Sequence, residues 1–561
     1  MIATTLGVGA VLRLAGIGFG LPAVYNPDEV AIMNRAIALG QNGLNPRNFL
    51  YPTFYFYVLF AWEGLLFAAG WLMGWFESLA AFEQQYFVDP SVFYVAGRLL
   101  SALCGVATIW ATWRLGLRLF GRVAGVAAAA LLAVAPLAVR DAHYVKHDVP
   151  VTLLIVLTHL ALSAALAGRL ERRWWLVGAL AGLSLSTHYY AVFVFVPIVM
   201  VMLSPLTPGE PLSARLRRTT ATLAVAGVAF IAASPFLLVE AGTTYRDMVA
   251  NREIVVDRAT TSGGAFASLA FYLRWLMADA SGSVAAALAL AGLVALARAG
   301  WLRAILTLAF PIVFVLFMAN TVPASRYLNP VLPFVALLGG AAVAWVSTVP
   351  RAGRVLALSA LTLAVGEAAL MAARGDMFFR QPDTRTMALE WFATNVPRGT
   401  SVLIQPYSVP LRNSREGLNE ALAHHLGDAE RASVRFQRQR ALDPYPEPSY
   451  RTIYLGSGGL DVDKIYVDPA VFAASKGLEP LRDLGITHVV MKRYNDEDPA
   501  MAPLEAALRK DGTLAATFSP YRLDADAAAR RETAPFLHNT DARIGRALER
   551  PGPIIDIWTI D

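Results

Sequence analysis

Cysteine and charge are the two features that this sequence has little of. The 561 residues include a single cysteine, Cys104, which lies in an apolar stretch. One cysteine excludes an internal disulfide and a metal site made of cysteine thiolates. Only 16% of the residues are charged, whereas 56% are hydrophobic and the mean hydropathy is +0.48. Because a soluble domain needs far less apolar surface to fill its core, lipid must solvate much of the chain.

The apolar residues are concentrated in the first two thirds of the chain. Residues 1–373 contain long uncharged stretches, close to the roughly 20 residues that a helix needs to cross a bilayer. The remaining sequence has the composition of an ordinary globular domain. We therefore predict two regions, a membrane domain over residues 1–374 and a separate domain over residues 375–561.

The basic residues are distributed among short connections and do not form one basic face. The net charge is +6 and the pI is about 9.3, a balance that can indicate nucleic-acid binding. The arginines instead cluster between apolar segments, so we predict no nucleic-acid partner and interpret them as topology signals. The clusters are Arg114, Arg118 and Arg122; Arg169, Arg172 and Arg173; Arg215, Arg217 and Arg218; Arg298 and Arg303; and Arg351 and Arg354.

The arginine clusters constrain how often the chain crosses the membrane. Short loops rich in arginine face the cytoplasm, so each adjacent pair of clusters must be separated by an even number of crossings. This rule predicts an α-helical polytopic membrane protein with about eleven spans, from residues 2–21 to residues 355–373. A crossing at residues 53–75 would place the first arginine cluster on the outer side. We therefore predict an interfacial or re-entrant helix there, within a large first outer loop.

The C-terminal region reads as a small α/β domain without a motif of its own. We predict a helix over Thr384–Asn395 and strands over Ser401–Gln405 and His488–Met491, separated by glycine and proline. Because the last predicted span ends on the outer side, this domain is expected to be extracytoplasmic.

Polar and aromatic side chains gather at the predicted outer ends of the helices. Charge at a membrane boundary costs free energy unless it is paired, hydrated or functional. An acid-and-base cluster drawn from distant segments is therefore a candidate functional site. The segments are Tyr25–Glu29, Arg98, His143–Asp148, His188–Tyr190 and Arg326–Tyr327.

The acidic residues also have an ordinary structural explanation. Asn26 is a preferred N-cap residue and Pro27 a preferred first helical residue. Asp28 and Glu29 then lie in the first turn, where carboxylates stabilise a helix. Asp148 could likewise cap the helix that follows it. These residues by themselves leave capping and catalysis both open.

The basic and aromatic residues have structural alternatives too. Lys146, Arg98 and Arg326 could be anchors that contact lipid headgroups. His188 could be a satisfied turn histidine, and residues 51–57 could belong to an interfacial aromatic belt.

Five short motifs follow one another on the predicted outer side. In this order they resemble the motifs of the GT-C class of lipid-carrier-dependent glycosyltransferases, specifically the protein O-mannosyltransferase and aminoarabinose-lipid A transferase group. The resemblance covers roughly residues 1–345 and departs from a His-Pro-Pro-Leu-Tyr-Tyr-like pattern of the group at Tyr51 and Thr53. The motifs are YNPDE with Asp28 and Glu29, YPTFYFY at Tyr51–Tyr57, Arg98-x-x-Ser101, Lys146-x-Asp148, and Arg326-Tyr327-x-x-Pro330-x-x-Pro333.

The resemblance implies a GT-C fold, an activity and a location. Such a bacterial enzyme sits in the plasma (inner) membrane and moves a sugar from a polyprenyl-phosphate donor to an extracytoplasmic acceptor. The acceptor is a protein, a lipid or a cell-envelope glycan, and the transfer usually inverts the anomeric centre. The expected partners are therefore the polyprenyl-phosphate-linked sugar, the acceptor and the lipid bilayer.

The resemblance also implies roles for individual residues. Asp28 is the expected general base. Glu29 and Asp148 are the other two expected catalytic residues, which could fix the acceptor, orient a cation or raise the pKa of Asp28. The groups expected to bind the donor phosphate are Arg326, Lys146, Arg98 and His188. The tyrosines expected to contact substrate are Tyr25, Tyr51 and Tyr144. The cofactor is left open; a divalent cation would find its ligands among Glu29, Asp148 and His188.

Two other classes of function compete with the enzyme. A transporter or flippase for a polyprenyl-linked lipid would also use basic outer groups, but it should show midplane charges or inverted repeats. Arg13 is the one candidate for such a charge. In a non-catalytic scaffold the acids would act only as helix caps.

Overall fold

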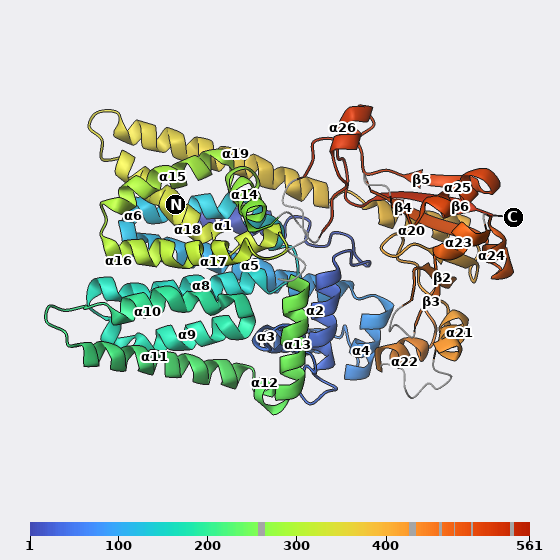
Figure 1. Ribbon diagram of the computed structural model, residues 1–561, viewed down its shortest axis with the longest axis horizontal. Helices are drawn as coiled ribbons and strands as arrows, with labels where there is room; N and C mark the ends of the chain where they lie inside the picture. The colour runs from blue at the N-terminus through green and yellow to red at the C-terminus, as the bar shows by residue number, and fades with distance from the viewer. Residues whose placement is uncertain are drawn as a thin grey trace.

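The computed structural model describes residues 1–560 except 256–263, 426–433, 459–462, 476, 495–497 and 539–543. Figure 1 shows an elongated molecule with a helical bundle at one end and a mixed sheet at the other. The helices up to residue 379 are α1 (Ile2–Leu14), α2 (Pro27–Ala38), α3 (Phe54–Leu72), α4 (Leu79–Val88), α5 (Ser91–Phe120), α6 (Arg122–Val134), α7 (Pro136–Asp141), α8 (Asp148–Leu162), η1 (Ser163–Ala167), η2 (Leu170–Arg172), α9 (Trp174–Thr187), η3 (Tyr189–Val194), α10 (Phe195–Leu203), α11 (Leu212–Ala233), α12 (Phe236–Val239), α13 (Ala241–Val255), α14 (Gly264–Trp275), η5 (Leu276–Ala280), α15 (Ser283–Ala297), α16 (Trp301–Ala304), η6 (Ile305–Ala309), α17 (Phe310–Met318), η7 (Ser325–Leu328), α18 (Leu332–Val346) and α19 (Gly353–Phe379).

The bundle has the dimensions of a multi-pass membrane protein. Among the described residues, 6 helices are long and apolar enough to cross a bilayer, or 7 if the pair of helices on either side of residues 281–282, bent by 116°, is one span. Five shorter apolar helices, of 10–17 residues, accompany them, including α1, α6 and α18. Length and composition do not decide which of these cross, so the predicted count of about eleven stays a prediction.

The segment predicted to be interfacial forms α3, which is long and apolar enough to span a bilayer. Figure 1 shows α3 close to end-on, whereas α8, α9, α10 and α11 run across the page. In the same view α2 and α13 also run across the direction of the bundle. The orientation of α3 agrees with an interfacial helix in the first outer loop and not with a further span beside α8–α11.

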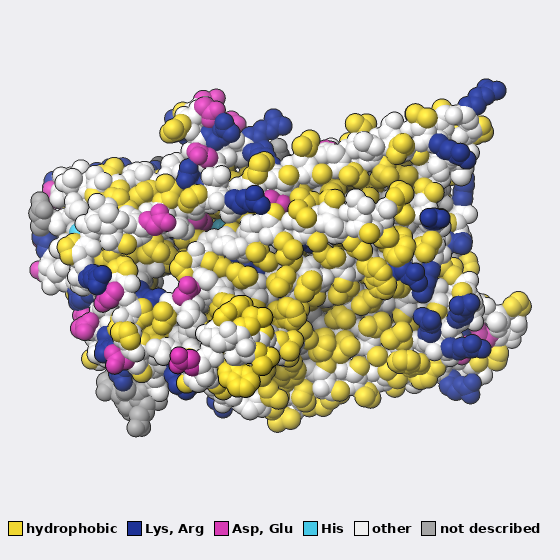
Figure 2. Space-filling model, turned by 180° about the vertical axis from the view of Figure 1, so that it is seen from behind, with side chains coloured by type: hydrophobic (Ala, Val, Ile, Leu, Met, Phe, Trp, Pro, Cys, Tyr) yellow, Lys and Arg dark blue, Asp and Glu magenta, His cyan; other side chains and the backbone are white. Residues whose placement is uncertain are grey.

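The surface is polarised along the long axis of the molecule. Figure 2 shows a broad belt of hydrophobic side chains over the bundle, with Lys and Arg side chains gathered at the end away from the sheet domain. The α10–α11 connection and α16 lie at that same end in Figure 1. This agrees with the prediction that the arginine-rich connections share one side, opposite the C-terminal domain.

The helices approach one another most closely where they carry glycine. A Cβ atom at Gly292 in α15 would lie 2.0 Å from the carbonyl oxygen of Leu338 in α18, and one at Gly182 in α9 would lie 2.3 Å from the carbonyl of Ala226 in α11. Since real side chains do not tolerate such distances, only glycine permits these contacts. Close packing through small residues is how helices associate in lipid, where apolar burial gives no net gain.

Arg13 is buried in the bundle and serves the backbone. Its Nη1 donates to the carbonyls of Gly9 and Ala133 at 3.0 and 2.8 Å, and its Nη2 donates to the carbonyl of Leu132 at 3.2 Å. Pro136 lacks the amide hydrogen that would normally bond to Leu132, so Arg13 supplies a donor where α6 breaks. These contacts give the single candidate midplane charge of a transporter a structural role.

The C-terminal region is an α/β domain built on one sheet. The strands run in the order β3-β2-β1-β4-β6-β5, with β3, β2, β1 and β4 parallel and β6 antiparallel to both neighbours. The predicted helix and both predicted strands are confirmed as α20, β1 and β4. The elements are α20 (Thr384–Asn395), β1 (Ser401–Ile404), α21 (Arg415–His425), α22 (Val434–Arg440), β2 (Arg451–Leu455), β3 (Ile465–Val467), α23 (Ala470–Ser475), α24 (Glu479–Asp483), β4 (His488–Arg493), α25 (Ala502–Asp511), β5 (Thr513–Phe518), α26 (Ala527–Glu532) and β6 (Ile554–Thr559).

Candidate functional site

The site begins at the N-terminus of α2, where local sequence fixes the position of two acids. Asn26 caps the helix, because its Oδ1 accepts a hydrogen bond from the amide of Asp28 at 3.0 Å. Pro27 occupies the first helical position. The capping interpretation is therefore correct, and it leaves Asp28 and Glu29 in the first turn, pointing in different directions about 100° apart around the helix.

Glu29 is turned into the protein and binds Arg98. The Nε and Nη2 of Arg98 donate to the two carboxylate oxygens of Glu29 at 3.0 Å each, and neither side chain is exposed. The amide of Val145 also donates to Glu29 at 2.9 Å. The remaining nitrogen of Arg98, Nη1, donates hydrogen bonds to the carbonyls of Ile17 and Phe19. The pair therefore joins α2, α5 and the loop before α8, and the structure does not bring either residue to the exposed part of the site.

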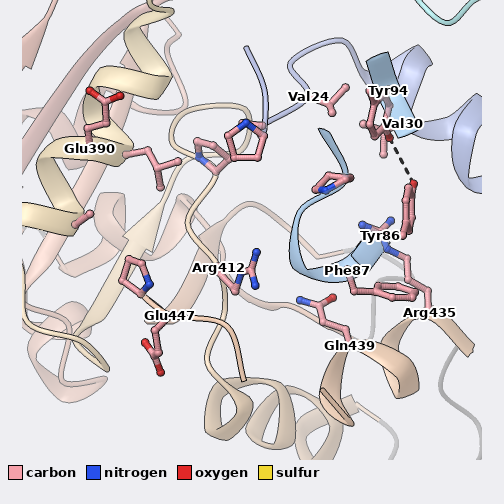
Figure 3. A pocket seen from close by; sticks show the side chains of 17 residues that line it. Val24, Val30, Tyr86, Phe87, Tyr94, Glu390, Arg412, Arg435, Gln439 and Glu447 are labelled. Carbon is pink, nitrogen blue, oxygen red and sulfur yellow. Dashed lines mark hydrogen bonds between the residues drawn. The ribbon is translucent and has the colours of Figure 1, made fainter. Parts of the chain in front are cut away.

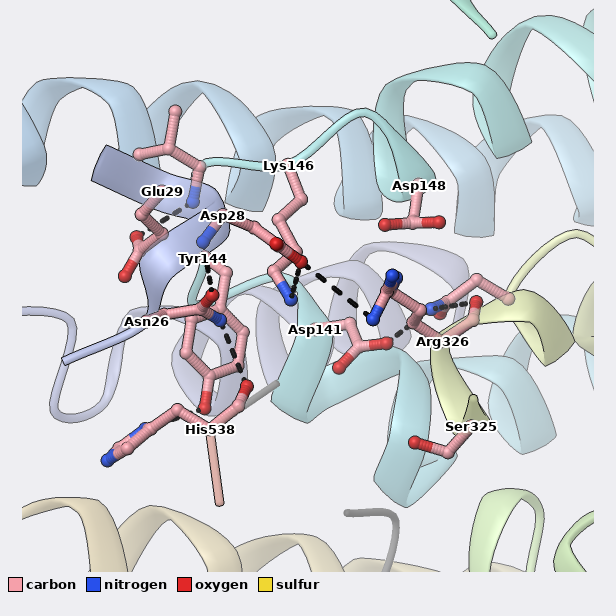
Figure 4. A network of polar contacts seen from close by, with 12 residues as sticks. Asn26, Asp28, Glu29, Asp141, Tyr144, Lys146, Asp148, Ser325, Arg326 and His538 are labelled. Atoms are coloured by element: carbon pink, nitrogen blue, oxygen red, sulfur yellow. Dashed lines mark hydrogen bonds and ion pairs between the residues drawn. The ribbon is translucent and has the colours of Figure 1, made fainter. Parts of the chain in front are cut away.

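Asp28 faces two cations from distant parts of the chain (Figure 4). Its Oδ2 lies 3.2 Å from the Nζ of Lys146 and 3.8 Å from the Nη1 of Arg326. The side chain of Asp28 is 28% exposed, that of Arg326 16% and that of Lys146 5%. Burial alone would raise the pKa of Asp28, but Lys146 and Arg326 outweigh it and hold this pKa below its ordinary value. Burial lowers the pKa of Lys146, and Asp28 opposes that change.

Asp148 completes the acidic part of the cluster at the start of α8. It is buried, and its Oδ1 accepts a hydrogen bond from the hydroxyl of Tyr190 at 3.2 Å. The negative charge of Asp148 also raises the pKa of Arg326, and Figure 4 shows both side chains in one cluster with Lys146. The structure therefore places Asp148 near Arg326, as expected, and adds Tyr190 as a partner.

Aromatic and imidazole rings form the wall beside this cluster. Tyr51 stacks on His147 with ring centroids 4.5 Å apart, and its ring lies 5.2 Å from that of His188. Burial lowers the pKa of His147 to about 3 and that of His188 well below its ordinary value, so both rings are neutral at pH 7. His188 accepts a hydrogen bond from the amide of Tyr190 at Nδ1, which leaves its Nε2 as a donor. His188 can therefore donate a hydrogen bond to phosphate but carries no positive charge.

The other two predicted substrate tyrosines contact the C-terminal region. The hydroxyl of Tyr25 lies 2.7 Å from the Oγ1 of Thr386, and Arg385 covers its ring at 3.9 Å. Tyr144 is buried, and its hydroxyl lies 3.0 Å from the Nδ1 of His538. Of the three tyrosines, Tyr51 is the one that the structure places in the wall of the Asp28 cluster.

The residues proposed for a divalent cation do not converge. The described part of the chain contains no group of three or more His, Cys, Asp and Glu side chains arranged to hold a metal ion. Glu29 faces Arg98, whereas Asp148 accepts from Tyr190. The expected ligand set of Glu29, Asp148 and His188 therefore does not fit a metal site in this structure.

Two residues of the cluster, Asp141 and His538, were not predicted from the sequence. Asp141 accepts hydrogen bonds from the side chains of Arg140 and Asn329, which ties α7 to the turn after Arg326. The feature of the sequence that could have identified Asp141 was its position next to Arg140. Tyr190 was recognised only as part of its segment. His538 gives no local signal at all, because it is an isolated histidine in the C-terminal region.

A cavity of about 530 Å³ lies between the first outer loop and the C-terminal domain (Figure 3). Val30 of α2 lines it, and Val30 and Asp28 project from roughly opposite sides of the helix. Its wall combines aromatic rings with charged and amide groups, a mixture typical of a site for a polar ligand. The labelled lining side chains are Val24, Val30, Tyr86, Phe87, Tyr94, Glu390, Arg412, Arg435, Gln439 and Glu447.

Comparison with known proteins confirms the fold class. Residues 91–238 match the family model described as dolichyl-phosphate-mannose-protein mannosyltransferase. The structure of ArnT from Cupriavidus metallidurans bound to undecaprenyl phosphate is similar over 92% of this chain and 96% of that chain, with a TM-score of 0.52 and 14% identity. The apo structure of the same ArnT is similar over 90% and 94%, with a TM-score of 0.50 and 15% identity.

A search of curated proteins finds no match to this sequence. At the identities just given, structural similarity shows the fold and not the substrate. The resemblance noted from the sequence motifs is thus confirmed: the chain has the fold of the GT-C glycosyltransferases together with a C-terminal α/β domain.

Proposed function

We propose that this chain is a membrane glycosyltransferase that moves a sugar from a polyprenyl-phosphate donor to an extracytoplasmic acceptor. The observation that carries the proposal is the contact of Asp28 with Lys146 and Arg326, which joins a partly exposed carboxylate to two cations from segments far apart in sequence. A base and a phosphate-binding pair are the two elements that such a displacement requires. The fold shared with ArnT, whose structure was determined with bound undecaprenyl phosphate, supports the same conclusion.

The proposed reaction is one displacement at the anomeric carbon with inversion. Asp28 takes the proton of the acceptor hydroxyl or amine as the new bond to the anomeric carbon forms. The bond between that carbon and the phosphate oxygen breaks, and its electron pair leaves with the lipid phosphate. Arg326 and Lys146 stabilise the added negative charge, Arg326 through its planar fork of donors.

The donor has to separate the ion pairs of the cluster when it binds. In a displacement with inversion the base and the leaving group lie on opposite faces of the sugar, so the sugar has to separate Asp28 from the two cations. When Lys146 and Arg326 turn to the phosphate, Asp28 loses the charges that lower its pKa, and its basicity rises. Donor binding would thereby activate the base.

The two regions of the chain divide this work in the proposal. Residues 1–374 hold the prenyl chain and carry the chemistry, and residues 375–561 cover the site from the outer side of the plasma (inner) membrane. Tyr51, Asp148 and His188 line the donor side, whereas Glu29 and Arg98 keep α2 in place.

Purified protein in proteoliposomes tests the proposal directly. We expect undecaprenyl phosphate to be released from at least one of its mannosyl, arabinosyl and aminoarabinosyl derivatives when an extract of cell-envelope acceptors is supplied. A flippase would move the intact sugar lipid across the bilayer without releasing undecaprenyl phosphate. Movement without release would therefore favour the transporter, and neither movement nor release would favour the scaffold.

Arg326 should control binding of the lipid phosphate. Replacing Arg326 by Ala should weaken the binding of undecaprenyl phosphate about 10- to 100-fold, because a charge-assisted hydrogen bond is lost. Lys at this position keeps the charge but not the planar fork of donors, so the affinity of Arg326→Lys should lie between those of the wild type and Arg326→Ala. Arg246, whose side chain is 72% exposed in α13, provides a matched control whose replacement by Ala should leave binding unchanged. Equal binding by wild type and Arg326→Ala in a direct titration would contradict the assignment.

A further inference from the structure

His538, in the C-terminal region, contacts two segments of the Asp28 cluster. Its backbone carbonyl accepts a hydrogen bond from the Nδ2 of Asn26 at 2.9 Å. Its Nδ1 lies 3.0 Å from the hydroxyl of Tyr144. Asn26 and Tyr144 each stand two positions before a member of the central ion pair, Asp28 and Lys146. His538 therefore contacts both segments that carry this ion pair (Figure 4).

The hydrogen-bonding capacity of the ring fixes the direction of this contact. The Nε2 of His538 lies 3.4 Å from Oδ2 of Asp383, a carboxylate that binds Arg385 through both oxygens at 2.7 and 2.8 Å. A carboxylate accepts hydrogen bonds only, so Nε2 carries the proton and Nδ1 accepts from the hydroxyl of Tyr144. Burial lowers the pKa of His538, which agrees with a neutral ring.

Asn26 connects His538 to α2, the helix that carries Asp28. Its Oδ1 holds the amide of Asp28, and its Nδ2 holds the carbonyl of His538, so both halves of one side-chain amide are used. The ring of His538 is also stacked on Phe19, with centroids 5.4 Å apart. All of these groups are buried, and such a network fixes geometry because each member has its partner.

We propose that His538 is a positioning residue, through which the C-terminal domain holds Asp28 and Lys146 in the geometry for sugar transfer. The inference rests on the proposed function, since it assigns to the tail domain control over the same site. His538 touches no reacting atom and acts through Asn26 and Tyr144. Displacement of a catalytic group by about 1 Å can cost on the order of 100-fold in rate, so a lost positioning contact should appear in kcat.

Three variants of the full-length chain in proteoliposomes test the inference. His538→Ala should lower kcat about 10- to 100-fold and leave the KM for the sugar-lipid donor nearly unchanged. His538→Gln should restore most of the rate, because its amide can donate to Asp383 and accept from Tyr144. Arg438→Ala is the matched control, since Arg438 makes a different contact between the two regions, an ion pair with Glu83 at 3.6 Å, and should keep the wild-type kcat.

Hydrogen exchange gives a readout that does not depend on transfer. The amide of Val145 follows Tyr144, whose hydroxyl loses its partner in His538→Ala, so this amide should exchange faster in that variant than in wild type or in Arg438→Ala. Asn26→Ser tests the other contact and does not require His538→Ala to fold: it keeps a capping oxygen, removes the donor to the backbone carbonyl of His538 and should make the amide of Asp28 exchange faster.

The two readouts separate failure of the inference from failure of the proposed function. Faster exchange in a protein without any transferase activity would leave His538 as a positioning residue and overturn the function. An unchanged kcat and exchange rate in His538→Ala, or an equal loss in Arg438→Ala, would overturn the inference and leave the function intact.

Discussion

Replacement of Asp28 by Asn should reduce sugar transfer by about 10²–10⁴-fold, the range that a positioned general base contributes. Asn is nearly the same size and cannot take a proton, so the change removes the base without leaving a hole. Asp28 is partly exposed and its backbone cap is made by Asn26, so the fold should not depend on its charge. The measurement is single-turnover release of undecaprenyl phosphate from the active sugar lipid.

The pH dependence of the same rate gives a second test of Asp28. Its pKa lies below the ordinary range in the unliganded site, so the base is ionised at neutral pH. The active form is present above this pKa and is lost as the pH falls through it, so loss of the base should make kcat/KM fall at a pH below the ordinary range of aspartate. Asp28→Asn should remove this acid limb. A full rate in Asp28→Asn at neutral pH would rule out the proposed base.

Local signals explain why much of the architecture could be predicted. Long apolar runs and short arginine-rich loops act through the bilayer, which imposes the same rule at every position. The cap at Asn26 depends on neighbouring residues alone, so the sequence was sufficient to predict it. In the C-terminal domain, alternation and helix starts located α20, β1 and β4 for the same reason.

The choice between two adjacent acids could not be made from local sequence. Asp28 and Glu29 are equally plausible in the motif, and only Arg98, 69 residues further along, decides that Glu29 faces inward. The contact of Asn26 with His538 bridges 512 positions, and no periodicity or spacing links them. Local sequence therefore could not predict contacts with remote partners, and Lys146 and Arg326 were expected from the resemblance alone.

The number of spans cannot be derived from hydropathy for a related reason. Hydropathy counts apolar residues, but breaks such as the one between α6 and α7 depend on a buried donor, Arg13, supplied by another helix. In the same way α3 is apolar enough to span, and its orientation across the bundle comes from its packing. Orientation is a property of contacts, which composition does not contain.

The Glu29–Arg98 pair should determine stability as strongly as Asp28 determines rate. Glu29→Gln leaves the guanidinium of Arg98 buried without its counter-charge, and removal of one member of a buried ion pair costs about 3–5 kcal/mol. We expect the free energy of unfolding in mixed micelles to fall by that amount. Replacement of both residues by Met removes both charges together and should restore a large part of the stability. Asp28→Asn, one residue away, is the comparison and should lose less stability, because Asp28 is partly exposed. If Glu29→Gln retains its stability but loses transfer, Glu29 belongs to the chemistry and the structural role assigned to it is wrong.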